Sequence, residues 1–191
     1  AVSMININEG SVKSTIAFYN YGTVGQNEID HCVGVNNYDD MVIPEMEFTS
    51  NDRMVAFGDT KAVIFEGAQK PQAIAEIPMD EKTKSIFYNE HYIGIVTGNE
   101  DEAVTNHLAV YDENGKLVME KDFGLDYSSI EFLTNNEICI RNANVCDIYT
   151  VHGVYKFHHE FEEELFEIIP GKLKLNYTLV LKDTTQRIRL K

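Results

Sequence analysis

An acidic turn, Asp112-Glu113-Asn114-Gly115, is the first segment whose residue types could do chemistry. Calcium-binding loops supply oxygen ligands from alternate positions of an Asp-x-Asp/Asn-x-Asp/Asn-Gly pattern, with a glutamate further along. Here the spacing is compressed, because Gly115 follows Asp112 by only three residues. Asn-Gly, in contrast, is the preferred pair for a hairpin turn that needs a positive φ. We therefore interpret this segment as a structural turn.

A denser acidic loop comprises Asn99, Glu100, Asp101 and Glu102. Its carboxylates and its amide could hold Ca²⁺ loosely, although the loop has no calcium-binding spacing signature. These residues are candidate metal ligands in a calcium-stabilised structural domain. The simpler interpretation is a solvated loop between two strands.

Two adjacent histidines, His158 and His159, are followed by Glu160. On a β-strand, successive side chains point to opposite faces, so the two histidines cannot share one ion. His158 and Glu160 would lie on one face, but the sequence identifies no third ligand. We therefore assign no metal site to this strand.

Cys139 and Cys146 lie close together in the sequence, on either side of Arg141-Asn142-Ala143-Asn144. If Asn142-Ala143 is a two-residue turn, the cysteines face each other across a hairpin, near disulfide-bonding distance. A disulfide and a pair of small buried thiols are the two alternatives. A register shift of one residue would remove the pairing.

The charge balance limits the partners of this protein. The chain has 16 Lys and Arg against 31 Asp and Glu, a formal net charge of −15. Such a surface repels phosphate backbones and anionic lipid head groups, so we expect binding neither to nucleic acid nor to a membrane surface. No apolar run approaches the roughly 18 residues that span a bilayer.

Short apolar runs, separated by clusters of Gly, Asn, Asp and Pro, predict an all-β protein. One pattern recurs at residues 63–77, 108–123 and 147–161: an apolar strand that ends in an aromatic residue, a turn with glycine, and a second strand. The aromatic residues Phe65, Tyr111 and Tyr149 are 46 and 38 residues apart. Another pair of short runs precedes each hairpin. The period is therefore about forty residues and four strands, the size of a β-propeller blade.

The second strand of each repeat is apolar at consecutive positions, so both of its faces must be buried. A sandwich would leave one face of each sheet in water, whereas blades stacked around an axis bury both. We predict a β-propeller-like array of about four to four and a half four-stranded antiparallel blades, in a single domain over residues 1–191. The approximate units are residues 1–44, 45–80, 81–126, 127–164 and 165–191.

The last unit ends after its third strand, which leaves an open sheet edge. Residues 2–8 could supply the missing strand, or the chain could be a fragment of a larger ring. A homodimer that pairs the open edges is the third alternative. The ring is incomplete in the second case.

The segment AVYDENGKLV (residues 109–118) resembles the hairpin of quinoprotein-type propeller repeats, which are related in form to WD40-type repeats. Their pattern is roughly Ala-x-Asp-x-x-Thr-Gly-Lys-x-x-Trp. Gly115 and Lys116 match it, and Asp112 lies one residue nearer to the glycine than the Asp of the pattern does. Met119 stands where the pattern has Trp, and the chain contains no Trp. We therefore expect no quinone and no other cofactor.

The stretches FYNYGTVGQN (residues 18–27) and VIFEGAQKP (63–71) are similar to an uncharacterised family of bacterial proteins. Members of that family have a short cytoplasmic tail, one membrane span and an extracytoplasmic propeller-like region. The resemblance implies that this chain lies outside the membrane and is attached only through an upstream segment. It also implies an interaction or sensing module whose partner is a protein or another surface ligand.

Catalytic motifs are missing from the sequence: it has no Gly-x-Ser-x-Gly elbow, no Walker loop and no Gly-x-Gly-x-x-Gly. Carboxylate pairs such as Asp39-Asp40 do occur, and some propeller glycosidases use such pairs. A chain with 31 acidic residues contains them without any catalytic role. We therefore expect no enzyme, with a carboxylate-dependent hydrolase in the propeller funnel as the alternative.

Overall fold

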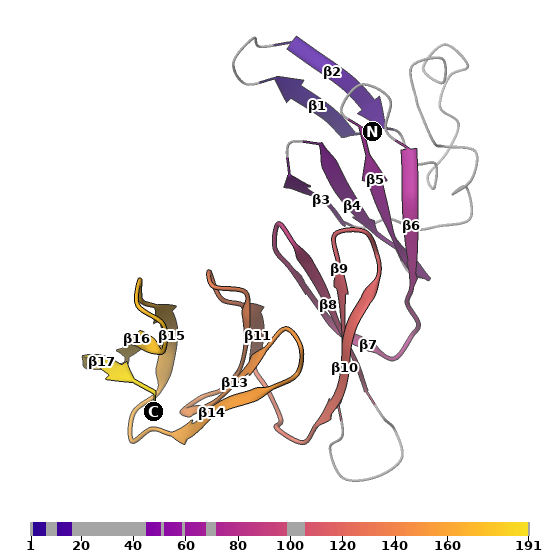
Figure 1. Ribbon diagram of the computed structural model, residues 1–191. Coiled ribbons are helices and arrows are strands. Elements are labelled where there is room, and N and C mark those ends of the chain that lie inside the picture. The colour runs from indigo at the N-terminus through magenta and orange to yellow at the C-terminus, as the bar shows by residue number, and fades with distance from the viewer. Residues whose placement is uncertain are drawn as a thin grey trace. The chain divides into compact units, whose positions relative to one another are not determined.

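The computed structural model describes residues 2–6, 11–16, 45–50, 52–58, 60–67, 72–98 and 106–190, and its regular elements are all β-strands (Figure 1). Within these ranges, no helix has the length and hydropathy needed to cross a membrane. The chain divides into two compact units. Unit 1 comprises Ala1–Glu81 and Glu113–Lys116, and unit 2 comprises Lys82–Asp112 and Leu117–Lys191.

Unit 1 contains a two-stranded and a four-stranded antiparallel sheet. The first consists of β1 (Val2–Asn6) and β2 (Ser11–Ile16). The second has the order β3 (Glu45–Ser50), β4 (Arg53–Phe57), β5 (Lys61–Glu66) and β6 (Gln72–Pro78). The apolar runs of β4 and β5 are buried from Met54 to Phe57 and from Ala62 to Phe65.

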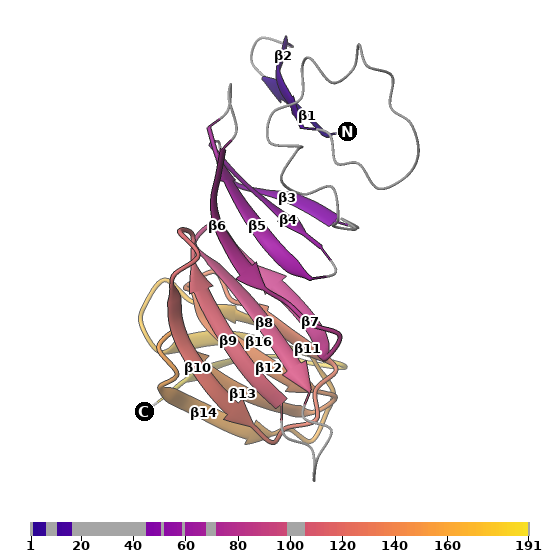
Figure 2. The same ribbon diagram turned by 90° about the vertical axis from the view of Figure 1, so that its right-hand side faces the viewer.

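Unit 2 contains three antiparallel sheets, each formed by consecutive strands (Figure 2). The first sheet consists of β7 (Thr83–Tyr88), β8 (Tyr92–Gly98), β9 (Asn106–Asp112) and β10 (Leu117–Phe123). The second consists of β11 (Ser129–Phe132), β12 (Glu137–Asn142), β13 (Val145–Thr150) and β14 (Tyr155–Glu160). The last sheet has only three strands, β15 (Leu165–Pro170), β16 (Asn176–Leu181) and β17 (Thr185–Arg189).

These sheets confirm the predicted fold class. Each four-strand repeat that the sequence indicated is a separate antiparallel sheet whose strands follow chain order. The fold is all-β and β-propeller-like, and the last sheet ends after its third strand, as predicted. The single-domain assignment and its approximate unit boundaries stay predictions.

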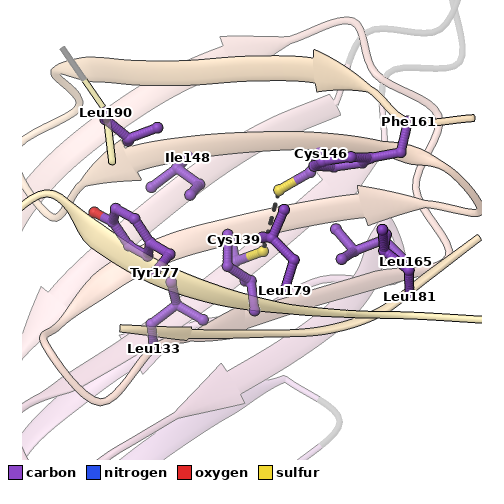
Figure 3. Packing of buried hydrophobic residues seen from close by; sticks show 11 residues of the cluster. Leu133, Cys139, Cys146, Ile148, Phe161, Leu165, Tyr177, Leu179, Leu181 and Leu190 are labelled. Atoms are coloured by element: carbon purple, nitrogen blue, oxygen red, sulfur yellow. Dashed lines mark hydrogen bonds between the residues drawn. The ribbon is translucent and has the colours of Figure 1, made fainter. Parts of the chain in front are cut away.

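The middle strands of the second sheet of unit 2 are buried on both faces, because two apolar clusters flank that sheet. Ile138 and Ile140 belong to the Phe87 cluster, which lies toward the first sheet. Cys139, between them in the sequence, belongs to the Cys139 cluster, which lies toward the last sheet (Figure 3). The members of the Cys139 cluster are Leu133, Cys139, Cys146, Ile148, Phe161, Leu165, Ile168, Tyr177, Leu179, Leu181 and Leu190. Because successive side chains of a strand point to opposite faces, β12 contributes residues to both clusters.

The second strand of the last sheet, β16, departs from this prediction. Its buried residues are Tyr177, Leu179 and Leu181, and the residues between them, such as Val180, are only half-buried. The Cys139 cluster covers one face of this sheet. The expectation that every second strand is buried on both faces is therefore wrong for β16, although it holds for β4, β8 and β12.

Arg141 connects the second sheet of unit 2 to the last. Its Nη1 donates a hydrogen bond to the backbone carbonyl of Phe166, at the start of β15. Its Nη2 forms an ion pair with Glu131, at 2.7 Å from Oε1. The guanidinium thus contacts β15 of the last sheet with one nitrogen and β11 of its own sheet with the other.

The N-terminal strand belongs to a local two-stranded sheet. Val2–Asn6 pairs with Ser11–Ile16, from Val2 opposite Ile16 to Asn6 opposite Ser11. That ladder uses one edge of the strand, so the alternative that residues 2–8 supply the missing fourth strand stays a prediction. The larger ring and the homodimer stay predictions.

Candidate functional site

The acidic segment around Asn114 is a hairpin turn between β9 and β10, as the sequence indicated. Gly115 has φ +74°, a conformation that L side chains rarely adopt. The glycine is therefore required by the backbone path. The turn explains the sequence pattern without a bound ion.

The calcium candidates Asn99, Glu100, Asp101 and Glu102 lie outside the described residues, so the calcium-stabilised alternative stays a prediction. In the part of the chain that the structure describes, no group of three or more His, Cys, Asp or Glu side chains is arranged to hold a metal ion.

The two adjacent histidines lie on opposite faces of β14, as strand geometry requires. His158 Nδ1 lies 2.7 Å from Oδ1 of the buried Asp147, directly across the ladder. The ring of His159 packs between those of Phe157 and Phe161, with ring centroids 6.0 and 4.6 Å away. The aspartate and the aromatic residues are thus structural partners for the histidines.

Cys139 and Cys146 meet within the Cys139 cluster as free thiols, with their Sγ atoms 3.6 Å apart (Figure 3). The turn differs from the one we predicted: Asn142 pairs with Val145, so Ala143-Asn144 forms the turn, and Ala143 has φ +48°. Relative to the predicted turn, the strand pairing is shifted by two residues, so Cys139 lies opposite Ile148 and not opposite Cys146. Both thiols remain on one face of the sheet, as diagonal neighbours. A hydrogen bond between them, together with burial, raises the pKa of Cys139. The disulfide stays a prediction.

A polar cluster that the sequence did not indicate joins β12, β14 and β16. The buried Glu137 accepts a hydrogen bond from the Tyr177 hydroxyl, at 2.6 Å, and forms an ion pair with Lys156 through its other oxygen. Lys156 Nζ also lies 3.5 Å from the tyrosine hydroxyl. The three side chains therefore satisfy one another, as buried polar groups require.

The environment of this polar cluster favours a neutral tyrosine. Burial raises the pKa of Tyr177 above its ordinary value of 10.0, and the hydrogen bond to the Glu137 carboxylate raises it further. A side-chain hydrogen bond from Asn135 has the opposite, smaller effect. The hydroxyl consequently stays a donor at neutral pH and is poorly suited to act as a base.

The turn between β15 and β16, Gly171–Leu175, lies beside the polar cluster. A cavity of about 510 Å³ is lined by both, including Glu137, Lys156, Lys172 and Lys174. A second cavity of about 480 Å³, which also includes Lys172 and Gly171, extends to Arg187 on β17. We call the turn with Lys156, Arg187 and Arg189 the basic end of unit 2.

Apolar side chains are exposed among these basic residues. Leu173 is 74% exposed and Leu175, which has φ +66°, is 36% exposed. Within the part of the chain that the structure describes, Lys172 and Lys174 form no ion pair. This surface therefore presents apolar contact area and positive charge together.

Sequence reasoning missed this site, although one signal of it was available. Glu137, Lys156 and Tyr177 are 19 and 21 residues apart on three different strands, so no local pattern connects them. The Lys-Leu-Lys-Leu alternation at residues 172–175 was the one available signal, because alternating leucines in a turn have no core to face.

Three solved structures illustrate what the fold is similar to. Hsv2 from Kluyveromyces marxianus is 9% identical with a TM-score of 0.50, and the match covers 77% of this chain and 46% of that one. BamB from Moraxella catarrhalis is 12% identical with a TM-score of 0.46, covering 87% and 46%. A protein of unknown function from Bacteroides caccae is 6% identical with a TM-score of 0.45, covering 98% and 67%.

The likeness to Hsv2, a β-propeller protein, supports the propeller-like fold. This chain spans about half the length of the Hsv2 and BamB structures. No curated protein matches it in sequence. One family model, that of a family of unknown function, matches residues 1–190. The chain therefore belongs to this family, DUF5711.

Proposed function

We propose that this chain is a non-catalytic interaction or sensing module of a bacterial cell-surface protein. It lies on the extracytoplasmic side and is attached to the membrane through a segment upstream of the chain. The resemblance of residues 18–27 and 63–71 to membrane-anchored bacterial proteins supports this location. The propeller-like fold supports an interaction role, because stacked blades present rigid ends on which turns can hold a partner.

The observation that carries this proposal is the basic end of unit 2. Residues 165–191 contain six Lys and Arg against two Asp and Glu, whereas the whole chain contains 16 against 31. This reversal of charge coincides with the exposed Leu173 and its flanking lysines. A local field of this sign attracts an acidic protein surface, and the leucines supply apolar contact area.

The polar cluster also fits an interaction module better than an enzyme. One carboxylate oxygen of Glu137 accepts from Tyr177 and the other pairs with Lys156, so each oxygen already has a donor within the cluster. The pKa of Tyr177 is raised by burial, which keeps its proton in place. A general base needs the opposite arrangement.

Site-specific photo-cross-linking in cells tests the interaction role. A photoreactive amino acid at position 173 of the full-length protein should give one discrete adduct, identified by mass spectrometry. The matched control is position 162, because Glu162 lies in the acidic turn after β14 and is exposed. No adduct at position 173, or the same adducts at both positions, would contradict the proposal.

The location and the lack of catalysis have separate tests. A protease added to intact cells should degrade this region of the full-length protein, and protection until lysis would refute the extracytoplasmic location. A hydrolase activity of the purified protein that is lost in Glu137→Gln but kept in Glu131→Gln would refute the non-catalytic assignment.

A further inference from the structure

Among the described strands, β17, the third strand of the last sheet, is paired along one edge only. Its ladder with β16 is regular from Asn176 opposite Arg189 to Val180 opposite Thr185, without a bulge. The flanking bonds run from Leu190 N to the Leu175 carbonyl, at 2.8 Å, and from Leu181 N to the Thr184 carbonyl, at 2.9 Å.

Hydrogen-bonded pairs alternate along an antiparallel ladder. With Leu190 and Thr184 bonded to the β16 side, the backbone groups of Gln186 and Ile188 also point toward β16. Those of Thr185, Arg187 and Arg189 point away from it. Among the described strands, β17 pairs only with β16, so these amides and carbonyls form an open row.

The side chains along this edge are basic on one face. Ile188 packs against the Cys139 cluster, so its neighbours Arg187 and Arg189 lie on the opposite face. Both arginines are exposed. Within the described part of the chain, neither forms an ion pair. In the three four-stranded sheets, the corresponding edge is covered by β6, β10 or β14.

A second copy of the chain is a poor occupant of this edge. Antiparallel pairing of β17 with β17 along its full length keeps the Ile188 side chains on a common face but sets Arg187 opposite Arg187. A register that sets Arg187 opposite Thr185 avoids this clash but pairs only residues 185–187 of each strand. Like charges directly opposite each other destabilise a strand pair. A shift by one residue would remove that clash only by moving Ile188 to the outer face. The chemistry of this edge therefore disfavours the predicted homodimer.

We propose that β17 accepts an extended acidic segment of a partner protein as the fourth strand of the last sheet. Asp or Glu at alternate positions of that segment would lie opposite Arg187 and Arg189. The residue between them would be apolar and would extend the buried face beside Ile188. Strand addition of this kind takes affinity from the backbone ladder and specificity from the alternate side chains. This inference rests on the proposed interaction role and names the chemistry of the partner.

Capped, fluorescein-labelled heptapeptides test this proposal on the full chain by fluorescence anisotropy. A peptide in which Glu alternates with Val should bind about tenfold more tightly than one in which Lys alternates with Val, because two cross-strand charge pairs change sign. The variant Arg187→Glu/Arg189→Glu should reverse this preference. Circular dichroism should show that the variant keeps its β-sheet.

A third peptide separates strand addition from simple charge attraction. N-methylation of the two Glu-Val peptide amides that face β17 removes the ladder bonds and leaves the charges unchanged. Its affinity should fall by about tenfold or more, since each lost hydrogen bond contributes about 1 kcal/mol. Equal affinity of the methylated peptide, or equal binding of the Glu and Lys peptides, would overturn the proposal.

Two further results would overturn it in favour of other occupants. One is a homodimer at micromolar concentration in light scattering that Arg187→Glu dissolves. The other is binding to vesicles that contain phosphatidylglycerol, with no binding to the Glu-Val peptide. A position-173 adduct in cells, combined with failure of the peptide, would refute the strand inference and leave the interaction role standing.

Discussion

The contribution of Tyr177 to stability depends on its hydrogen bond to Glu137. Its hydroxyl donates to the buried Glu137, which otherwise has only Lys156. Tyr177→Phe should lower the free energy of unfolding by about 1 to 3 kcal/mol, because a buried carboxylate oxygen loses its donor. Urea denaturation measures the change. Tyr92→Phe is the control, since that ring packs against Phe132, and its effect should be within about 0.5 kcal/mol.

Two tyrosines make the protein sensitive to alkali. Burial and the nearby Asp147 raise the pKa of Tyr149 to about 12, and burial with the Glu137 hydrogen bond raises the pKa of Tyr177. Above pH 10 the unfolded chain therefore binds fewer protons at these residues than the folded chain does.

The contribution of the two tyrosines to stability should be complete below about pH 10 and should be lost as the pH rises through the folded pKa values. Denaturation midpoints between pH 8 and pH 12 measure this loss, and Tyr149→Phe should flatten the decline. A midpoint that is constant up to pH 12 would contradict it.

At the scale of the element, β8 shows why a buried strand contains glycine. A Cβ at Gly94 would lie 2.3 Å from the ring of Phe87, on the adjacent β7. Gly94→Ala should therefore cost about 1 to 3 kcal/mol, because the buried ring must move. Gly98 in the same strand is the matched control. Its added Cβ would meet only the flexible end of Lys84, so Gly98→Ala should be nearly neutral. Equal costs in thermal denaturation would show that the ring does not set the constraint.

The last sheet should respond to truncation on one face only. Leu179 is fully buried in the Cys139 cluster, whereas Val180, its neighbour on β16, is half-buried on the other face. Leu179→Ala should lower the unfolding free energy by about 2 to 5 kcal/mol, and Val180→Ala by less than about 1 kcal/mol. Chemical denaturation compares them directly. A large cost at both positions would mean that a further layer covers the outer face in solution.

At the scale of the whole molecule, charge is the dominant property. A net charge of −15 on 191 residues destabilises the compact state through self-repulsion, which salt screens. The melting temperature should therefore rise by a few degrees between about 10 and 200 mM NaCl. Adding millimolar CaCl₂ in 200 mM NaCl should raise it no further than MgCl₂ does. A rise specific to Ca²⁺ that Asp101→Asn abolishes would establish the calcium-stabilised alternative.

The repeat of strands was predictable because it depends on local chemistry. Apolar runs such as 54–57 and 93–96 can satisfy their backbone groups and bury both faces only in stacked sheets. Turn residues such as Gly115 mark the hairpins through their backbone conformation. The turn after Asn142 was harder to place, because neither Ala143 nor Asn144 is a strong signal and two registers keep the cysteines on one face.

The sequence by itself determined the strands, their grouping in fours, and the short last sheet, because each depends on residues within about forty positions. Only the tertiary structure decided that Glu137, Lys156 and Tyr177 meet, because cross-sheet contacts between blades leave no local pattern. The same holds for β16, whose apolar run is only half-buried on one face because, within the described part of the chain, an apolar cluster packs against one side of its sheet. Likewise, only the register of β17 in the tertiary structure decided which of its backbone amides point away from β16 and that Arg187 and Arg189 lie on the same face.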